Sequence, residues 1–147
     1  MGDLMVLIFF GFVSVLGVYS LYSKTFVIDM ILPALTIGLL STAVLNLNNM
    51  RDYQNDAKSG KNTLVVKMGP NVAKLYHTTL IIFAISSLGI FISLFQQPLL
   101  FVALLPAIML LIHLRKVMQT TDTKQFDPEL KVVALSTFAL SIFMLVM

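Results

Sequence analysis

Two aspartates four residues apart are the first candidates for chemistry in this sequence. Asp52 and Asp56 lie in a long polar stretch, residues 48–63 (NNMRDYQNDAKSGKNT), of a chain that is otherwise strongly apolar. The first twelve residues of the stretch contain no proline or glycine, so we expect them to be helical. Residues four apart on a helix share one face, and Asn48 and Asn49 lie one turn earlier on nearly the same face. The spacing therefore predicts a ridge of oxygen ligands.

Two neighbouring carboxylates repel each other unless positive charge lies near them. No basic residue lies three or four positions from either aspartate, so we expect compensation from another segment or from a cation. Mg²⁺ prefers such hard oxygen ligands and commonly joins one or two carboxylates to substrate phosphates. Arg51 and Lys61 are placed to bind the same phosphate oxygens directly. The plain alternative is a solvated helix end, because acids and bases often crowd exposed surfaces.

Other polar residues suggest simpler roles. Asn46 lies a turn inside the apolar segment, and we interpret its amide as a hydrogen-bonding group between helices. His77 and His113 have no carboxylate or second histidine at ligand spacing, which favours positions at the membrane interface for both. Residues 122–129 contain three acids, but Pro128 interrupts them and their spacing does not repeat the paired-aspartate pattern. We therefore expect a solvated connection there.

Composition indicates which elements position these groups. Hydrophobic residues make up 58% of the chain, charged residues only 12%, and the mean hydropathy is +0.92. Such values are typical of integral membrane proteins. Apolar runs near the roughly 20 residues that a helix needs to cross a bilayer predict an all-α, polytopic membrane protein. The five predicted spans of this single transmembrane helical domain (residues 1–147) are 4–22, 28–47, 78–95, 98–114 and 132–147, with a cytoplasmic motif loop at 48–77.

Local signals mark the ends of some of these helices. Asp29 is placed to cap the second span, and Pro33 falls near the first turn of that span, where a missing N–H costs little. Pro106 lies inside the fourth span and predicts a kink there. Ser59 and Gly60 form a helix stop near the end of the polar stretch.

The loops differ in their basic residues, and this difference predicts an orientation. The loop after the second span carries Arg51 and four lysines, and the loop after the fourth carries Arg115 and three lysines. Under the positive-inside rule both loops face the cytoplasm. We therefore predict a multi-pass protein of the cell membrane with its N-terminus inside and its C-terminus outside. The small net charge of +3 implies no nucleic-acid partner, and the lack of cysteine excludes thiolate chemistry.

The motif segment resembles a known family. Residues 48–66, with the pattern NNMRDxxxDxxxGKxTLVV, are similar to the second aspartate-rich motif of the UbiA superfamily of membrane prenyltransferases. Residues 9–17 and 73–77 agree with this resemblance. Within the superfamily, the sequence looks most like the enzymes of menaquinone synthesis that prenylate 1,4-dihydroxy-2-naphthoate.

This resemblance implies a fold, a reaction and a site. Members typically have nine helices and two aspartate-rich motifs, so the five predicted spans and the single motif resemble the C-terminal part of such a bundle. The implied reaction transfers a polyprenyl group from polyprenyl diphosphate to the naphthoate ring, with Mg²⁺ as cofactor. Asp52 and Asp56 would then be catalytic residues that hold the metal. The residues implied to bind diphosphate, two of them also as outer ligands of the metal, are Asn48, Asn49, Arg51 and Lys61.

The single motif leaves several readings open. The chain is expected to act as a partial or split enzyme, beside an N-terminal half that carries the first motif. Alternatively, it is a non-catalytic membrane helper subunit, or a prenyltransferase that acts on a different aromatic acceptor. A CDP-alcohol phosphotransferase also uses membrane aspartates and Mg²⁺, but the Asp-Gly and Ala-Arg pairs upstream of its motif do not appear here.

Overall fold

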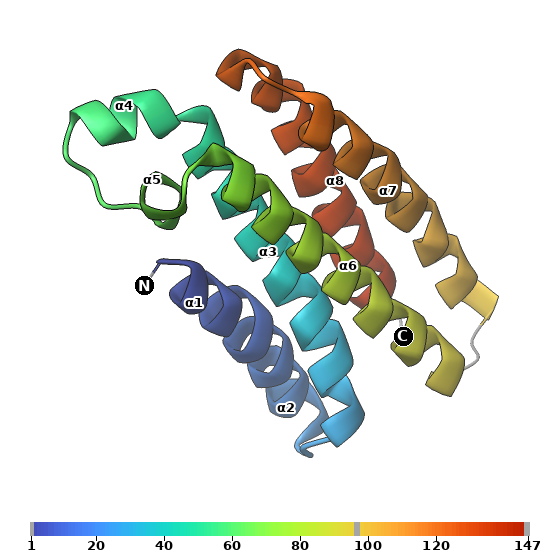
Figure 1. The fold of residues 1–147 in the computed structure, drawn as a ribbon. Coiled ribbons are helices and arrows are strands. Elements are labelled where there is room, and N and C mark those ends of the chain that lie inside the picture. Colours follow the sequence, from blue (N-terminus) through green and yellow to red (C-terminus); the bar gives the residue numbers. More distant parts are fainter. Residues whose placement is uncertain (1, 96–97, 146–147) are drawn as a thin grey trace.

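Helices account for nearly all of the chain (Figure 1). The computed structural model describes residues 2–95 and 98–145, and no strand occurs within them, so the predicted all-α class is confirmed. The elements in chain order are α1 (Gly2–Val6), the π-helical η1 (Leu7–Leu16), α2 (Gly17–Ser23), the 3-10 turn η2 (Ile28–Met30), α3 (Ile31–Arg51), α4 (Tyr53–Lys58), α5 (Leu64–Met68), α6 (Pro70–Phe95), the 3-10 turn η3 (Pro98–Ala103), α7 (Leu104–Gln119), the 3-10 turn η4 (Thr123–Gln125) and α8 (Phe126–Leu145).

Four helical stretches in the described part of the chain are long and apolar enough to cross a membrane. Each contains most of one of the first four predicted spans. The third stretch begins at Pro70, so α6 includes the last residues of the predicted motif loop, 48–77. The position of that loop outside the membrane stays a prediction. The four stretches are Gly2–Ser23, Ile28–Arg51, Pro70–Phe95 and Phe101–Gln119.

The fifth predicted span corresponds to α8, which differs from the other four. α8 begins at Phe126, before the predicted start at residue 132, and its first turns carry Asp127, Glu129 and Lys131. Within the described residues, α8 is not among the helices that are long and apolar enough to cross a membrane. The end of the predicted span, residues 146 and 147, lies outside the described residues. A membrane crossing by α8 stays a prediction.

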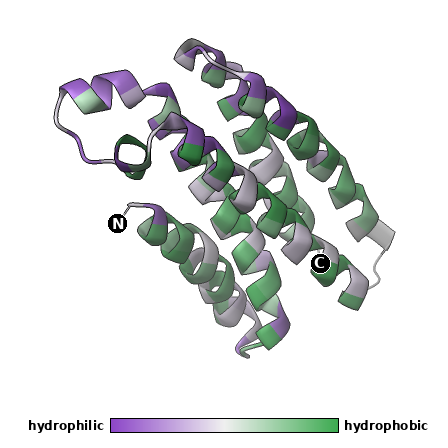
Figure 2. Cartoon of the chain, viewed as in Figure 1, coloured by the Kyte–Doolittle hydropathy of each residue, from purple (hydrophilic) through white to green (hydrophobic). Residues whose placement is uncertain are grey.

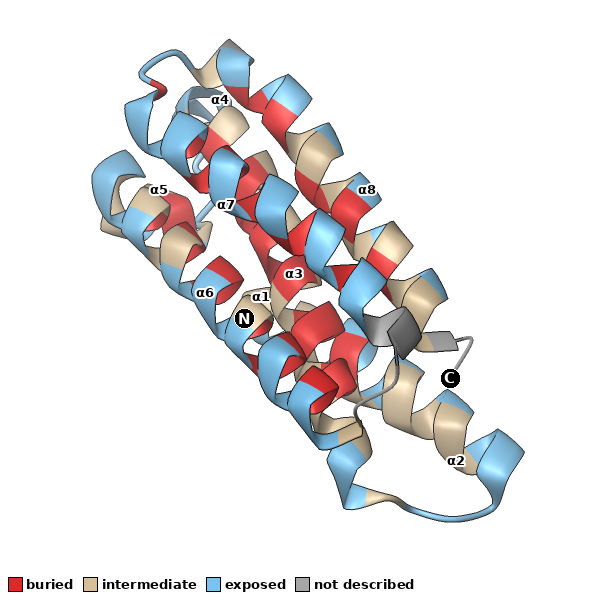
Figure 3. Cartoon of the chain, turned by 90° about the vertical axis from the view of Figure 1, so that its right-hand side faces the viewer, coloured by how far each residue is buried: buried red, intermediate tan, exposed pale blue. Residues whose placement is uncertain are grey.

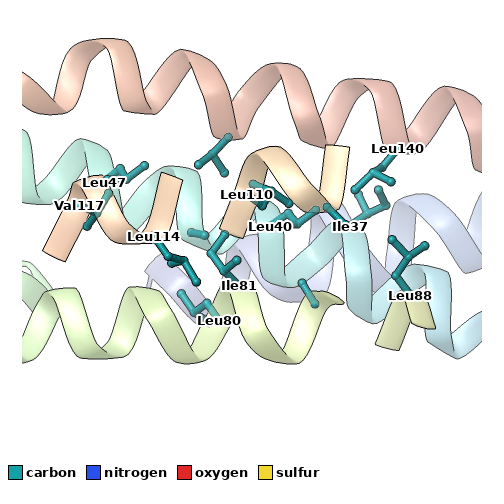
Figure 4. Close-up of a cluster of buried hydrophobic side chains, with 14 of the residues drawn as sticks. Ile37, Leu40, Leu47, Leu80, Ile81, Leu88, Leu110, Leu114, Val117 and Leu140 are labelled. Carbon is teal, nitrogen blue, oxygen red and sulfur yellow. The ribbon is translucent and has the colours of Figure 1, made fainter. Parts of the chain in front are cut away.

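The centre of the bundle is α3, along which buried residues recur from end to end (Figure 3). It packs against η1, α6 and α8. Because lipid is as apolar as these side chains, close packing rather than escape from water holds the helices together. Figure 4 shows side chains from several helices meeting in this core, among them Leu40, Leu47, Ile81, Leu88, Leu110, Leu114 and Leu140. The aspartate motif therefore begins at the end of the most deeply packed helix.

Two glycines bring the first helical stretch close to α3. A Cβ on Gly11 would lie 2.6 Å from the carbonyl oxygen of Ala34, and a Cβ on Gly38 would lie 2.9 Å from the carbonyl oxygen of Leu7. Small residues at such crossings are typical of helix pairs in membranes, because they let the backbones approach each other. This contact fixes the first stretch beside α3.

The predictions for helix ends have mixed outcomes. Pro33 lies in the first turn of α3, as expected. The predicted kink at Pro106 is wrong, because this proline lies in the first turn of α7, where no N–H has an intrahelical partner to lose. The predicted cap at Asp29 is also wrong. Asp29 lies within η2, whose N-cap is Val27, and no side chain caps either η2 or α3.

Hydrophilic residues gather at one end of the bundle (Figure 2). This end holds α4, α5 and the N-terminus, whereas α8 runs away from it toward the C-terminus at the opposite end (Figure 1). The N-terminus and the motif therefore lie at the same end of the molecule. Which side of a cell membrane that end faces stays a prediction.

Candidate functional site

The motif segment joins the end of α3 to the short helix α4. α3 ends at Arg51, and Asp52 has backbone angles φ −89° and ψ 3°. The continuous helix predicted for residues 48–59 is therefore wrong at this one residue, after which the chain turns into α4 (Figure 1). The amide of Asp56 still donates to the carbonyl of Asp52 at 2.9 Å, so the two aspartates keep helical spacing. The predicted helix stop is confirmed, and Gly60 has φ +72°.

A guanidinium clamps the first aspartate. Arg51 donates from Nε to Asp52 Oδ1 at 2.9 Å and from Nη2 to Asp52 Oδ2 at 3.0 Å. Arg51 Nη2 also donates to Asn48 Oδ1 at 2.7 Å, so the three residues form one hydrogen-bonded cluster. The hydrogen bonds from Arg51 hold the pKa of the Asp52 carboxyl below its usual value. The Arg51 and Asp52 side chains are 32% and 34% exposed, so the cluster is open to water.

A lysine neutralises the second aspartate. Lys61 Nζ lies 3.1 Å from Asp56 Oδ1 and 3.2 Å from Asp56 Oδ2. Both aspartates therefore pair with bases of their own segment, whereas the sequence analysis expected compensation only from another segment or from a cation. A cation at the motif stays a prediction. Helical spacing could not indicate these pairs. Arg51 is adjacent to its partner, and Lys61 follows the helix stop, so neither base lies three or four positions away.

The three asparagines near the motif have different surroundings. Asn48 is half-buried and bonded to the guanidinium, and Asn49 is only 7% exposed. Their roles as diphosphate or outer metal ligands stay predictions. Asn46 is fully buried, and neither its Oδ1 nor its Nδ2 has a hydrogen-bond partner within the described part of the chain. The prediction of an interhelical hydrogen bond from Asn46 is therefore wrong within the described residues.

The oxygen atoms of the motif are suitable ligands for Mg²⁺, but they are too few to complete its coordination. Asp52, Asp56 and Asn48 offer the hard oxygens that this ion prefers. Among the residues that the structure describes, no three acidic, histidine or cysteine side chains come together in a group able to hold a metal ion. Magnesium sites often complete their coordination with substrate phosphates and waters. The segment therefore fits a cation that binds together with a phosphate ligand.

A second cluster of ionisable side chains lies inside the bundle, and the sequence analysis missed it. The Nε2 atoms of His77 in α6 and His113 in α7 are 2.9 Å apart, and His113 Nδ1 lies 2.7 Å from Glu129 Oε2 in α8. The three residues, which we name the buried chain, are 0%, 1% and 5% exposed. Both histidines therefore lie inside the bundle, and they have the second histidine and the carboxylate that the sequence analysis did not find. Their depth relative to a membrane stays a prediction. The members are 36 and 16 positions apart, so no local pattern in the sequence signals their contact.

Asp127 reaches the motif from the first turn of α8. Its Oδ1 accepts a hydrogen bond from Arg51 Nη1 at 3.2 Å. The solvated connection predicted for residues 122–129 is therefore wrong as well. This segment contains η4 and the start of α8, and it places Asp127 on the motif and Glu129 in the interior.

Comparison with known proteins points to one family. The UbiA prenyltransferase family matches over residues 1–146. The chain is 42% identical to the 1,4-dihydroxy-2-naphthoate octaprenyltransferase of Escherichia coli over 133 residues, which are 89% of this chain and 43% of that protein. It is 48% identical to the Haemophilus influenzae protein of the same name over 81 residues, which are 55% of this chain and 26% of the relative. Human UbiA prenyltransferase domain-containing protein 1 is 32% identical over 81 residues, which are 55% of this chain and 24% of that protein.

These relatives are much longer than the region they share with this chain. The chain spans 43% of the length of the Escherichia coli protein and 26% of the Haemophilus influenzae protein. No solved structure matches it.

Proposed function

The chain belongs to the UbiA prenyltransferase family, and from that premise we propose that it takes part in the Mg²⁺-dependent transfer of a polyprenyl group from polyprenyl diphosphate to 1,4-dihydroxy-2-naphthoate in menaquinone biosynthesis. The observation that carries the proposal is the 42% identity to 1,4-dihydroxy-2-naphthoate octaprenyltransferase of Escherichia coli across 89% of this chain. The motif adds chemical support, because it gathers two carboxylates and two bases at the polar end of an apolar bundle.

The proposed activity belongs to a larger unit than this chain. The chain spans less than half of the Escherichia coli relative, and the motif supplies one pair of carboxylates. One pair leaves the opposite side of a diphosphate unclamped. We therefore propose that an N-terminal half with the other aspartate motif completes the site, either in the same longer protein or as a separate partner.

Different residues of the motif would bind the metal and the charged leaving group. Asp52 and Asp56 would hold the magnesium ion, and Asn48 and Asn49 would act as outer ligands or bind diphosphate. When bound, Mg²⁺ neutralises charge on the leaving diphosphate and acts as a Lewis acid. The proposed reaction breaks the bond between the allylic carbon and the diphosphate oxygen. The naphthoate ring then bonds to that carbon, and pyrophosphate and CO₂ leave.

The two bases of the motif would exchange partners when substrate binds. In the free chain Arg51 bonds to Asp52, and Lys61 bonds to Asp56. A diphosphate offers these bases stronger acceptors, and a guanidinium can bind two phosphate oxygens at once. The carboxylate oxygens that the bases leave are then available to a cation. Water can stabilise Arg51, Asp52 and Lys61 when the pairs separate, because all three side chains are partly exposed. The Asp56 side chain is only 10% exposed, so the incoming cation would have to replace its lysine.

The apolar helices suit the remainder of the substrate. A polyprenyl chain is a hydrocarbon, and the described part of the protein has four helices long and apolar enough to lie in a membrane. Helices packed around the reacting carbon would also keep water from capturing an allylic cation. We propose that the protein lies in the cytoplasmic membrane with the motif and N-terminus inside and the C-terminus outside, in line with the basic loops.

A transfer assay tests the proposed function. Membranes that contain only this chain, from a host without its own activity, are given radiolabelled polyprenyl diphosphate and 1,4-dihydroxy-2-naphthoate. Because the proposed site needs the other aspartate motif, we expect no product from this chain alone. Product that forms with Mg²⁺ and disappears with EDTA would show instead that the chain completes its site by self-association. A variant with Asp52→Asn and Asp56→Asn is the matched control for background transfer.

Co-expression separates the two ways in which the assay can fail. If the inserted chain gives no product alone, the part of the Escherichia coli relative that it does not cover is expressed with it. Product in the joint preparation, and in neither half alone, supports a split enzyme. No product in the joint preparation, with both halves inserted and associated, contradicts the proposed activity and favours a non-catalytic helper.

A further inference from the structure

The buried chain of His77, His113 and Glu129 has no part in the reaction proposed above. Three ionisable side chains inside a helical bundle lose their contacts with water, and that loss is unfavourable unless each finds a partner. Well-packed apolar residues often stabilise such a position equally well or better. Stability alone therefore does not explain the cluster, and its geometry suggests that it fixes the arrangement of helices.

The hydrogen-bonding capacity of each side chain indicates which atoms donate and which accept in the buried chain. Glu129 Oε2 is an acceptor, so the nearby His113 Nδ1 carries a hydrogen and donates it. In a neutral His113, Nε2 then accepts, and His77 Nε2 donates to it. His77 Nδ1 has no hydrogen-bond partner among the described residues. Each member therefore orients the next, starting from the carboxylate.

Glu129 connects the buried chain to the first turns of α8. Its second oxygen, Oε1, lies 3.4 Å from Nζ of Lys116, and both Lys116 and His113 belong to α7. Two groups of α7 therefore hold one carboxylate of α8. A shift or rotation of α8 at this level would break both contacts and leave a charge buried without partners.

The same turns of α8 also touch the motif. Asp127 lies two residues before Glu129, and its Oδ1 accepts from Arg51 Nη1 at 3.2 Å. Arg51 in turn bonds to both oxygens of Asp52. The Asp127 side chain is 60% exposed, so water screens this ion pair and the pair alone cannot fix α8. The buried chain supplies the anchorage that the exposed pair lacks.

We propose that the buried chain positions the aspartate motif: it holds the first turns of α8 in place, and Asp127 transmits that position to Arg51 and Asp52. The residues proposed to bind diphosphate or metal do not include His77, His113, Asp127 or Glu129. We therefore treat these four as positioning residues. The functional part of this inference rests on the proposed function, because it takes Arg51 and Asp52 as a diphosphate site. The positional part rests on the contacts alone.

A distance measurement tests the positional part without any substrate. The sequence contains no cysteine, so spin labels can be placed at chosen sites in the complete chain. Gln54→Cys in α4 and Leu135→Cys in α8, both exposed, report the distance between the motif and α8 in lipid nanodiscs by pulsed electron paramagnetic resonance. We expect one narrow distribution, and a broader or shifted one when Glu129→Gln is added. An unchanged distribution overturns the proposal.

Pyrophosphate binding tests the functional part. Asp127→Asn and Glu129→Gln should each weaken the Mg²⁺-dependent binding of inorganic pyrophosphate roughly threefold to tenfold. The double variant should lose no more than the stronger single variant, because both changes interrupt the same connection. Lys131→Gln is the matched control, since Lys131 is exposed on α8 and lies outside the buried chain. Additive losses, or tighter binding by Asp127→Asn, overturn the proposal.

Two further outcomes remain decisive. If the unmodified chain shows no Mg²⁺-dependent binding, the motif alone is not a diphosphate site and the functional part of the inference fails, whereas the co-expression assay still tests the proposed function. The distance measurement then decides whether the buried chain positions α8. If Glu129→Gln does not fold, Asp127→Asn carries the test, because Asp127 is exposed and the asparagine side chain has nearly the same shape as the aspartate side chain. Unchanged pyrophosphate binding by Asp127→Asn then overturns the proposal.

Discussion

Two clusters of ionisable side chains lie toward the same end of this bundle, and water reaches one of them far more than the other. In the motif, the side chains of Arg51 and Asp52 are 32% and 34% exposed, and Lys61 is 58% exposed beside an Asp56 that is only 10% exposed. In the buried chain, those of His113 and Glu129 are 0% and 7% exposed. Both clusters pair acids with bases at similar distances, so exposure rather than chemical type separates them.

This difference determines what each cluster can do. A pair open to water can separate at small cost and take a ligand in place of its partner. A pair enclosed by helices cannot separate without leaving a polar or charged group unsatisfied. The motif is therefore suited to exchange partners with a substrate, and the buried chain is suited to hold the helices still. Changes in the first should mainly affect binding, and changes in the second should mainly affect stability.

The largest expected effect is the loss of binding at the motif. Asp52→Asn together with Asp56→Asn removes both charges that would hold a cation, and we expect Mg²⁺-dependent binding of pyrophosphate to weaken by about a hundredfold or more. Thermal unfolding in detergent should change little, because water screens the Arg51–Asp52 pair and an asparagine at position 56 can still accept a hydrogen bond from the exposed Lys61. Titration calorimetry measures the first quantity. Asn55→Ala, on the exposed face of α4, is the control, and retained binding in the double variant would remove the central assignment of the site.

The buried chain should show the opposite pattern. His113→Leu removes the partner of His77 and leaves Glu129 with only Lys116, so we expect a loss of about 2–5 kcal/mol in the free energy of unfolding. Unfolding in detergent, followed by circular dichroism, measures it. The matched variant combines His113→Leu with Glu129→Leu, and it should recover much of the loss because no buried charge remains unpaired. A single variant as stable as the unmodified chain would show that the contacts are not important for stability.

The features that could be predicted from the sequence are those that depend on neighbouring residues. Hydropathy located four helical stretches, because a run of apolar residues is itself the property that a membrane requires. The relation between Asp52 and Asp56 was predicted for the same reason, since helical spacing places residues four apart together. The helix break at Asp52 was missed, and nothing in the residue types there signals it. The pairing of Arg51 with its neighbour was missed with it.

The features that could not be predicted depend on how each helix is rotated about its axis. The buried chain takes one member each from α6, α7 and α8, and periodicity within one helix does not indicate which faces of three helices meet. Glu129 was assigned to a solvated connection because its neighbours are polar and Pro128 follows Asp127. Proline is tolerated in the first turn of a helix, so it lies near the start of α8 without ending it.

The pH dependence of Mg²⁺ binding provides a further test of the motif. The pKa of Asp52 is lowered mainly by its hydrogen bonds to Arg51. A carboxyl with a lowered pKa stays anionic to lower pH, and its contribution is lost only as the pH falls through that lowered value. In Arg51→Gln the pKa should return toward the usual value of about 3.9, so the acid limb of Mg²⁺ binding should move to higher pH.

The measurement for this prediction is Mg²⁺ affinity without phosphate, as a function of pH, in both proteins. Lys58→Gln is the control for a lost positive charge, since Lys58 is exposed in α4 and should leave the acid limb in place. Identical acid midpoints in Arg51→Gln and the unmodified chain would contradict the assignment of Arg51 as the main cause of the lowered pKa.

The smallest expected effect concerns the stability of the second motif pair. Lys61→Gln removes the base of Asp56, and we expect a loss of only about 0.5–1 kcal/mol in the free energy of unfolding, because the lysine is largely exposed and the glutamine amide can still donate to the Asp56 carboxylate, which is 10% exposed. High salt should bring the unmodified chain toward the variant, since it screens exposed pairs, and should barely affect the loss caused by His113→Leu. Parallel unfolding curves at low and high salt measure both quantities. If Lys61→Gln destabilised the chain as much as His113→Leu, exposure would not separate the two clusters, and the motif would be a structural ion pair rather than one that can exchange its partners with a ligand.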